Sequence, residues 1–558
     1  MLTRILIAIG VALALADASV VTLALPPILI ELDTTVEGVA AVLGVYTLVL
    51  AAGLPAAEWL RRRTGSARLG VIGFVVFALA GLGCGAVDSL APLLVLRAVQ
   101  ALGAAAGLVS GFALLTSGEA GRERLWTAAA IFGTAAGPAL GGVLTELFDW
   151  RAIFLVQAPI GALAAAACAR PLTTPQPLGS ANGGPPAPVL PRLRDVELGP
   201  TVALALVSAA LSGVLFLLVL LLVSGWSISP LGAALTVTLL PAAALVGMRI
   251  TGGPRLRAAA GCSLVGAGVL ALAFLNSASV VWTFVPQLLA GVGMGLALTS
   301  LVGPLLSERT PADTAFLLAV RHAGITLALL LLAPITAAQL DSVATDTRER
   351  GAALVLDAEL PPLGKLDLAS AVTGELDPVD PRETLRSSLD AGADSFADDP
   401  EEAAAYAELA SRADETLVDG IDRAFTPAFL IAGGLALLAA VFVLPRHDRR
   451  ARTISLAVAS AALAVSAAQA ALSVASAPEL VTIADPCEER DLPGTGGIDG
   501  IVQDVALRGL DRAACEFGSS REELAIALVD EDAASEYERE HGVDPRSIDD
   551  LIGGVIGL

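Results

Sequence analysis

Residues 133–142 read GTAAGPALGG and lie within an apolar stretch that is long enough to cross a membrane. Gly133, Gly137 and Gly141 recur every four residues, so a helix here presents a flat stripe that admits a second helix at close range. Pro138 interrupts the hydrogen-bond ladder of the same helix and predicts a local bend. We therefore expect a transmembrane helix that packs tightly against a neighbour.

The rest of the chain shares this apolar character. Of its 558 residues, 55% are hydrophobic and 16% are charged, and the mean hydropathy is +0.74. A helix needs about 20 mostly apolar residues to cross the hydrocarbon core, and thirteen such stretches occur. The predicted spans are 4–30, 38–59, 69–87, 90–117, 125–147, 152–169, 199–224, 228–248, 258–276, 279–306, 315–340, 425–445 and 453–477.

Basic residues follow every even-numbered span. They are Arg61, Arg62, Arg63 and Arg68; Arg122 and Arg124; Arg170, Arg192 and Arg194; Arg249, Arg255 and Arg257; Arg309; and Arg446, Arg449, Arg450 and Arg452. Because short loops rich in Lys and Arg stay in the cytoplasm, we expect a cytoplasmic N-terminus. The odd number of spans then places the C-terminus outside. The predicted location is the plasma (cytoplasmic) membrane, with the lipid bilayer around the spans.

Negative charge is concentrated in two segments outside these spans. Residues 341–423 hold 21 Asp or Glu and 7 Lys or Arg, and residues 478–558 hold 20 and 6. Such segments repel phosphate, so we expect no nucleic-acid partner. The first segment either gathers cationic substrates above the pore or is simply a solvated surface. The second is predicted to be a small helical domain, open to an extracytoplasmic protein partner.

The cysteines divide by environment. Cys84, Cys168 and Cys262 fall in apolar spans, where cysteine behaves as a small buried hydrophobe. Cys487 and Cys515 lie in the predicted external tail, where oxidation is permitted. We therefore predict a disulfide between Cys487 and Cys515.

The first span carries an acidic residue in LADASVVTLALPPI, from Leu15 to Ile28. Asp17 lies 13 residues beyond Arg4, about 20 Å along a helix. An ionisable group at that depth often marks an ion or proton pathway, and desolvation disfavours its charged form. Asp17 is therefore a candidate for reversible protonation, and a permanent hydrogen bond to Ser19 is the alternative.

The fourth span reads LRAVQALGAAAG and places Arg97 and Gln100 about one helical turn apart. A buried Arg keeps its charge and demands an anionic or carbonyl partner. Arg97 either biases the proton affinity of a nearby carboxylate or forms a fixed link between helices.

Together these motifs resemble those of the drug:proton antiporters of the major facilitator superfamily. DASVVTLALP in the first span, RAVQALGAA in the fourth, GTAAGPALGG in the fifth and WRAIFLVQAPIGA entering the sixth occur in that family's order. The resemblance covers residues 1–340 and 425–445, and its sharp motifs lie in the first six spans. It implies proton-coupled export of small amphipathic or cationic compounds by alternating access.

The resemblance also assigns roles to residues. It implies proton coupling for Asp17 and Arg97. It implies a part in transport or gating for Gln100, Gly133, Gly137, Pro138, Gly141, Gly142 and Gly65. We expect no enzyme activity, cofactor or metal, because the sequence shows no catalytic constellation. The partners implied are protons and a small-molecule substrate.

Some positions depart from the family pattern. After the second span, Glu58 stands where a glycine is expected and Arg62 where an acid is expected, so the family's gating ion pair is not carried over. Whether Glu58 replaces that acid stays open. The usual tryptophan ahead of Tyr46 is missing, and Gln157 stands where Asn is common.

The predicted fold is all-α and polytopic, with two six-helix bundles of the major facilitator fold. The bundles span 1–170 and 199–445, and a Pro- and Gly-rich cytoplasmic linker at 171–198 joins them. The acidic insertion 341–423 lies within the second bundle. A basic loop and extra helix at 446–477 and a helical domain at 478–558 follow the second bundle. We expect Arg321 and His322 to reach the cytoplasmic interface instead of a deep site.

A degenerate transporter scaffold that anchors the external domains is the alternative function.

Overall fold

The computed structural model is all-α over the residues that it describes. These are 1–116, 123–170, 197–275, 277–306, 310–362, 364–365, 368, 380–445, 448–476, 481–490, 492–493 and 497–547. Most of the predicted linker and the last residues of the predicted C-terminal domain lie outside this set. Twelve described helices are long and apolar enough to cross a membrane, and α6, whose two segments are bent by 51°, makes thirteen if counted as one span. The prediction of an all-α polytopic fold is confirmed.

The helices follow the predicted order, but α1 and α2 divide the first predicted span, and α13 and α16 extend well beyond theirs. They are α1 (Leu2–Thr22), α2 (Leu25–Glu31), α3 (Val36–Thr64), α4 (Ser66–Cys84), α5 (Leu90–Thr116), α6 (Glu123–Leu147), α7 (Trp150–Cys168), α8 (Leu198–Leu220), α9 (Pro230–Val237), α10 (Leu239–Arg249), α11 (Pro254–Leu272), α12 (Val281–Leu301), α13 (Pro311–Asp357), α15 (Pro381–Ala393), α16 (Pro400–Val443), α17 (Arg449–Ala475), α18 (Gly497–Phe517), α19 (Arg521–Val529) and α20 (Glu531–His541).

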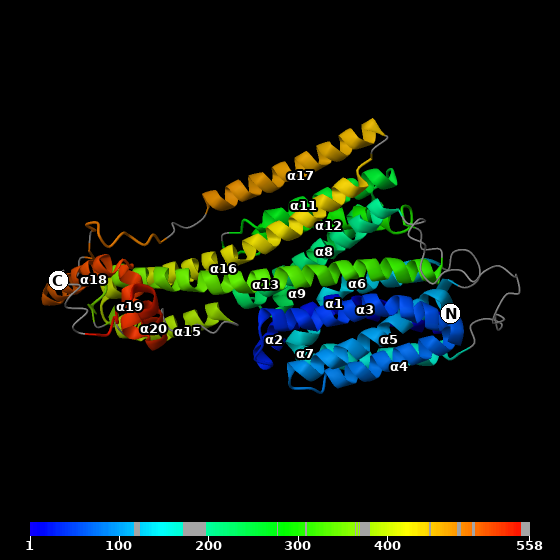
Figure 1. The fold of residues 1–558 in the computed structure, drawn as a ribbon, viewed down its shortest axis with the longest axis horizontal. Coiled ribbons are helices and arrows are strands. Elements are labelled where there is room, and N and C mark those ends of the chain that lie inside the picture. Colours follow the sequence, from blue (N-terminus) through cyan, green and yellow to red (C-terminus); the bar gives the residue numbers. More distant parts are fainter. Residues whose placement is uncertain are drawn as a thin grey trace, which may run out of the picture.

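The spans run back and forth along one long axis (Figure 1). Helices α1 to α7 form a first group, and helices α8 to α16 form a second group beside it. Helix α13 packs along α3 at the seam, where the Thr47 and Thr326 hydroxyl oxygens lie 2.9 Å apart. The N-terminus lies at one end of the molecule, here called the N-terminal end, and α18 to α20 lie at the other, here called the insertion end.

Helices α13 and α16 are much longer than a membrane is thick. Their 47 and 44 residues extend about 70 and 66 Å, against a hydrocarbon core of about 30 Å. Both helices therefore continue beyond the predicted span ends at 340 and 425, into the acidic insertion. Because no proline falls between Pro334 and Pro361, the charged stretch after 340 continues the helix. The acidic insertion is thus built largely on extensions of two spans.

Ion pairs hold these extensions together at the insertion end. Asp346 of α13 lies 3.1 Å from Arg350 and 3.3 Å from Arg423 of α16. Arg382 of α15 lies 2.7 Å from Asp414 of α16. These partly exposed pairs add modest stability individually, but together they fix α13, α15 and α16 to one another.

Helix α17 packs on the outside of the second group, against α11. The Ser466 hydroxyl donates a hydrogen bond of 2.6 Å to the carbonyl oxygen of Ala267. The Gln469 amide donates one of 2.8 Å to the carbonyl oxygen of Trp282. Polar side chains seldom face lipid, so these two bonds fix which face of α17 meets the other helices.

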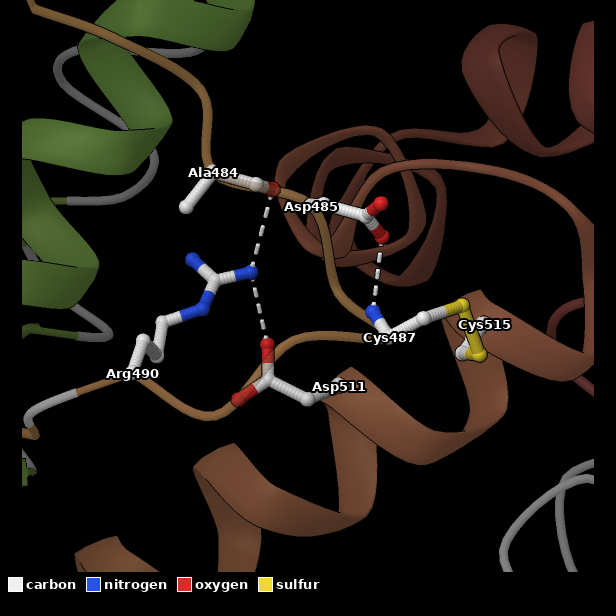
Figure 2. Close-up of a disulfide and its surroundings, with 6 residues drawn as sticks. All are labelled: Ala484, Asp485, Cys487, Arg490, Asp511 and Cys515. Carbon is white, nitrogen blue, oxygen red and sulfur yellow. Dashed lines mark hydrogen bonds and ion pairs between the residues drawn. A yellow bond between two sulfur atoms is a disulfide. The ribbon is translucent and has the colours of Figure 1, made fainter.

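The C-terminal helices α18, α19 and α20 form a small unit at the insertion end. Its buried apolar residues are Ala513, Ala514, Leu524, Ala527 and Tyr537. A disulfide joins Cys487, in the segment before α18, to Cys515 within α18 (Figure 2), and the two Cα atoms lie 5.1 Å apart. Arg490 reaches back across the same loop and lies 2.8 Å from Asp511. The disulfide therefore ties the extended segment to the helical core.

This unit contacts the far end of α13 through one buried arginine. The Arg521 side chain is 0% exposed, and its Nη2 atom lies 2.6 Å from Asp357 Oδ1 and 2.8 Å from Glu522 Oε1. Ser520 caps α19 by accepting a hydrogen bond of 3.0 Å from the Glu523 amide. The end of α13 thus carries the C-terminal unit.

Docking of the C-terminal unit should depend on pH through Glu349 of α13. Burial, with the nearby carboxylates of Glu523, Asp346, Glu522 and Glu540, raises the Glu349 pKa from 4.5 to about 7. The docked form therefore takes up a proton more readily than the undocked form. Docking should be tightest below pH 4.5 and weaken as the pH rises through about 7. Hydrogen exchange of α19 and of residues 345–357 measures this.

The variant Glu349→Gln should be about three- to tenfold better protected than the natural protein at pH 8, and nearly equal to it at pH 5. Comparing the two proteins at each pH removes the intrinsic pH dependence of exchange. Equal protection at pH 8 would contradict the assignment of this effect to Glu349.

Candidate functional site

The candidate site begins with an ion pair buried in the first helix group. Arg97 of α5 places its Nη2 atom 2.7 Å from Asp17 Oδ2 of α1, and both side chains are 0% exposed. The Arg97 Nε atom also donates to the carbonyl oxygen of Val42, at 3.3 Å. The sequence singled out both charged residues separately, and the structure brings them into contact.

Two glutamines close a ring around this pair. The Gln157 amide of α7 donates a hydrogen bond of 2.9 Å to Asp17 Oδ1. Its oxygen accepts one of 2.8 Å from Gln100, and the Gln100 oxygen accepts one of 2.7 Å from Arg97 Nη1. Each glutamine side chain thus forms hydrogen bonds with two other residues of the ring, and these bonds connect α1, α5 and α7. Sequence reasoning noted Gln157 only as a departure, although an amide in an apolar span was a signal.

Tyr46 of α3 completes the surroundings of Arg97. The guanidinium carbon lies 4.2 Å from the centre of the Tyr46 ring, a distance typical of a cation–π contact. The Tyr46 hydroxyl donates a hydrogen bond of 3.1 Å to the carbonyl oxygen of Ala14 in α1. The face of the ring thus stabilises the arginine charge while its hydroxyl holds α1. No sequence pattern links Tyr46 to Arg97.

The glycine stripe of α6 packs directly on α1. A Cβ atom added at Gly133, Gly137 or Gly141 would overlap α1 atoms. At Gly141 the overlapping atom is the carbonyl oxygen of Val20, and at Gly137 it belongs to Ser19. Gly142 instead faces α9 of the second group. The helix carrying Asp17 therefore touches α6 with almost no side chain between them.

A central cavity of about 100 Å³ lies between the two helix groups. Helix α1 lines it with Leu15, Ala18, Ser19 and Thr22, which recur at helical spacing on one face. Asp17 is not on that face and points into the first group, toward α5 and α7. The ring and the cavity therefore lie on different sides of α1.

Two basic residues of α13 also line this cavity. Arg321 and His322 belong to its wall, and His322 is 4% exposed. The prediction that both reach the membrane interface is therefore wrong. Helix α13 begins at Pro311, which puts the two residues about 15 Å into the helix at 1.5 Å per residue. None of the described residues that line the cavity is acidic.

Near the junction of α3 and α4, Glu58 forms ion pairs with arginines of its own helix. Its carboxylate is buried and lies 2.7 Å from both Arg61 and Arg62, within one turn of the same helix. Gly65 follows with a φ of +86°, a conformation that glycine adopts at little cost, and α4 begins at the next residue. Glu58 therefore pairs locally with the basic cluster.

Comparisons with known proteins give the following similarities. Residues 7–338 match the model of the Major Facilitator Superfamily. The multidrug resistance protein Stp of Mycobacterium tuberculosis is 36% identical over 169 residues, which cover 29% of this chain and 32% of Stp. The methylenomycin A resistance protein of Bacillus subtilis is 36% identical over 166 residues, covering 29% of this chain and 36% of that protein. The chain thus spans about a third of the length of these curated relatives.

A solved structure shares the fold. The inward-facing, unoccupied structure of a bacterial homologue of the human lysosomal transporter Spinster aligns with a TM-score of 0.51 at 16% identity. The alignment covers 79% of this chain and 97% of that structure. At this identity the likeness concerns the arrangement of the helices alone.

The α1–α6 contact should be intolerant of even one added methyl group. Gly141→Ala puts a Cβ atom against the Val20 carbonyl oxygen, and such overpacking costs about 1–3 kcal/mol. The control is Gly44→Ala in α3, because a Cβ atom at Gly44 has no neighbour within 4 Å. That change should stabilise the helix by about 0.5–1 kcal/mol. Thermal unfolding in detergent measures both shifts, and a Gly141→Ala protein at least as stable as the control would contradict the packing argument.

Proposed function

Because the chain belongs to the Major Facilitator Superfamily, we propose that it is a proton-coupled exporter of small amphipathic compounds that works by alternating access. It is a multi-pass membrane protein. The observation that carries the proposal is the closed ring of Asp17, Arg97, Gln100 and Gln157. The resemblance of 29% of the chain to proteins named for multidrug and methylenomycin A resistance supports export.

The ring is suited to taking up and releasing one proton. Asp17 is the acidic member of the ring, and its charge is balanced by Arg97 at 2.7 Å. A proton on Asp17 Oδ2 removes that balance and leaves Arg97 to Gln100, the Tyr46 ring and the Val42 carbonyl oxygen. Protonation therefore changes what holds α1 to α5, which is the effect that proton coupling needs.

Helix α1 supplies the route from this ring to the cavity. Ser19 lines the cavity two residues beyond Asp17 and touches Gly137 of α6. The glycine stripe presents a nearly flat surface, so a small shift or rotation of α1 meets few side-chain obstacles there. A change at Asp17 can thus alter the cavity wall without substrate ever contacting the carboxylate.

The cavity lining supports an amphipathic substrate. Leu211, Leu215 and Ile325 supply apolar surface, while Ser208 and Ser212 supply hydroxyls on the same wall. The absence of an acidic residue among the described lining residues means that the central cavity itself does not favour cations. We therefore propose amphipathic compounds and assign no positive charge to them at this site. An intact ring beside a cavity also argues against a degenerate scaffold.

The charge pattern supports one orientation in the cytoplasmic membrane. Arg61, Arg62 and Arg63 lie at the end of α3, at the N-terminal end of the molecule. The disulfide of Cys487 and Cys515 lies at the insertion end. Basic loops stay inside and disulfides form outside, so we place the N-terminal end in the cytoplasm and the insertion end outside.

Replacing Asp17 should uncouple transport from protons. In inverted vesicles, uptake of the neutral amphipathic dye Nile red driven by a proton gradient should fall about tenfold or more in Asp17→Asn. This variant leaves Arg97 buried without its counter-charge, at a cost of about 3–5 kcal/mol. The double variant Asp17→Asn/Arg97→Gln removes both charges, so it should recover much of that stability and still lack proton dependence. Fluorescence of the dye and thermal unfolding measure the two effects.

The matched control is Asp33→Asn, which makes the same chemical change at an exposed position beyond α2. It should transport as the natural protein does. Undiminished proton dependence in either Asp17 variant would rule out the proposed role of the ring. A panel of cationic and anionic dyes alongside Nile red separates loss of coupling from a poor choice of substrate.

A further inference from the structure

A second and larger cavity, here called the outer chamber, lies at the insertion end. Its volume is about 510 Å³, within the range of about 300–1,000 Å³ that holds drug-sized ligands. One wall is Leu29 and residues 34–37, from the turn between α2 and α3 of the first group. The other walls come from the extensions of α13 and α16 and from the start of α15. The chamber is therefore formed jointly by both helix groups and the acidic insertion.

The lining of the outer chamber is apolar with a small net negative charge. Leu340, Leu385 and Leu417 supply apolar surface from α13, α15 and α16, respectively. The charged lining residues are Glu37, Asp341 and Arg348, two acids and one base. The surrounding insertion, residues 341–423, holds 21 acidic and 7 basic residues, so its field adds to that negative charge.

The two lining acids differ from their neighbours in how they are paired. Outside the chamber, Asp414 and Asp419 are bound to arginines at 2.7 and 2.9 Å. Among the described residues, Glu37 and Asp341 take part in no ion pair. Both are exposed, so their charge is available to a molecule in the chamber. A carboxylate beside apolar walls favours a ligand that combines positive charge with apolar surface.

The outer chamber lies in line with the central cavity. One face of α13 lines the central cavity at Ile325 and Leu329 and lines the outer chamber at Ala337, Leu340 and Ala344. These residues recur at helical spacing. The gap from Leu329 to Ala337 corresponds to about 12 Å of helix. The outer chamber therefore lies further along α13 than the central cavity, toward the insertion end.

We propose that the outer chamber is a binding site for amphipathic cations, separate from the central cavity. It selects by charge, which the central cavity does not, and it owes its walls to the extended forms of α13 and α16. The site stands apart from proton coupling, because none of its lining residues belongs to the Asp17 ring.

Equilibrium dialysis of the purified full-length protein tests the proposal with two probes of equal shape and opposite charge. Tetraphenylphosphonium should bind at least about tenfold more tightly than tetraphenylborate. The double variant Glu37→Gln/Asp341→Asn should weaken tetraphenylphosphonium binding about tenfold. Leu340→Trp, which adds side-chain volume to one wall of the chamber, should weaken it severalfold. The control Glu408→Gln removes one exposed charge of α16 that does not line the chamber and should leave the affinity within about twofold.

Equal affinity for the two probes, or undiminished binding in the double variant and in Leu340→Trp, would overturn the proposal. Thermal unfolding of each variant verifies that it is folded. The two proposals fail separately: loss of proton dependence is read from Asp17, and loss of cation binding is read from the chamber variants.

Discussion

The buried contact between Asp17 and Arg97 is the constraint on which the first helix group depends. Neither charge is exposed, and an isolated charge in an apolar interior costs several kcal/mol, so each requires the other. The remaining polar atoms then need partners as well, which is why amides from α5 and α7 gather around the pair. The position of α1 follows from these bonds on one side and from the glycines of α6 on the other. The result is a helix held by directional bonds on one face and by close packing on the other.

The second group is organised differently. Its described spans hold few charged side chains, and its distinctive feature is length: α13 and α16 continue past the membrane as a paired extension. Ion pairs such as that of Arg423 with Asp346 secure the extension, and a buried arginine, Arg521, attaches the C-terminal unit to its end. Among the described residues, the charged side chains of the first group's spans lie mainly in the Asp17 ring. Most charged side chains of the second group lie in the extensions of α13 and α16. Both cavities are lined by residues of the first group and of the second group.

Much of the fold could be predicted from sequence because apolar length and arginine placement are local signals. Thirteen stretches, their order and the acidic insertion were readable in this way. The ends of α13 and α16 were not, because a charged amphipathic stretch without proline looks the same whether it continues a span or forms a new helix. Asp17 and Arg97 stood out as charges in apolar spans, but their contact depends on how α1 packs against α5. Gln157, Tyr46 and the cavity positions of Arg321 and His322 depend on tertiary packing, which no local pattern reports.

The unbroken length of α13 has a mechanical consequence. The helix lines the central cavity near its start and carries the C-terminal unit about 50 Å further on, at Asp357. Its antiparallel partner α16 packs along it and limits its bending. If α13 tilts by about 10° about its position at the central cavity, its far end moves through roughly 9 Å. Helix α13 therefore couples the central cavity to the C-terminal unit, so that a small tilt at the cavity becomes a larger displacement of that unit at the insertion end.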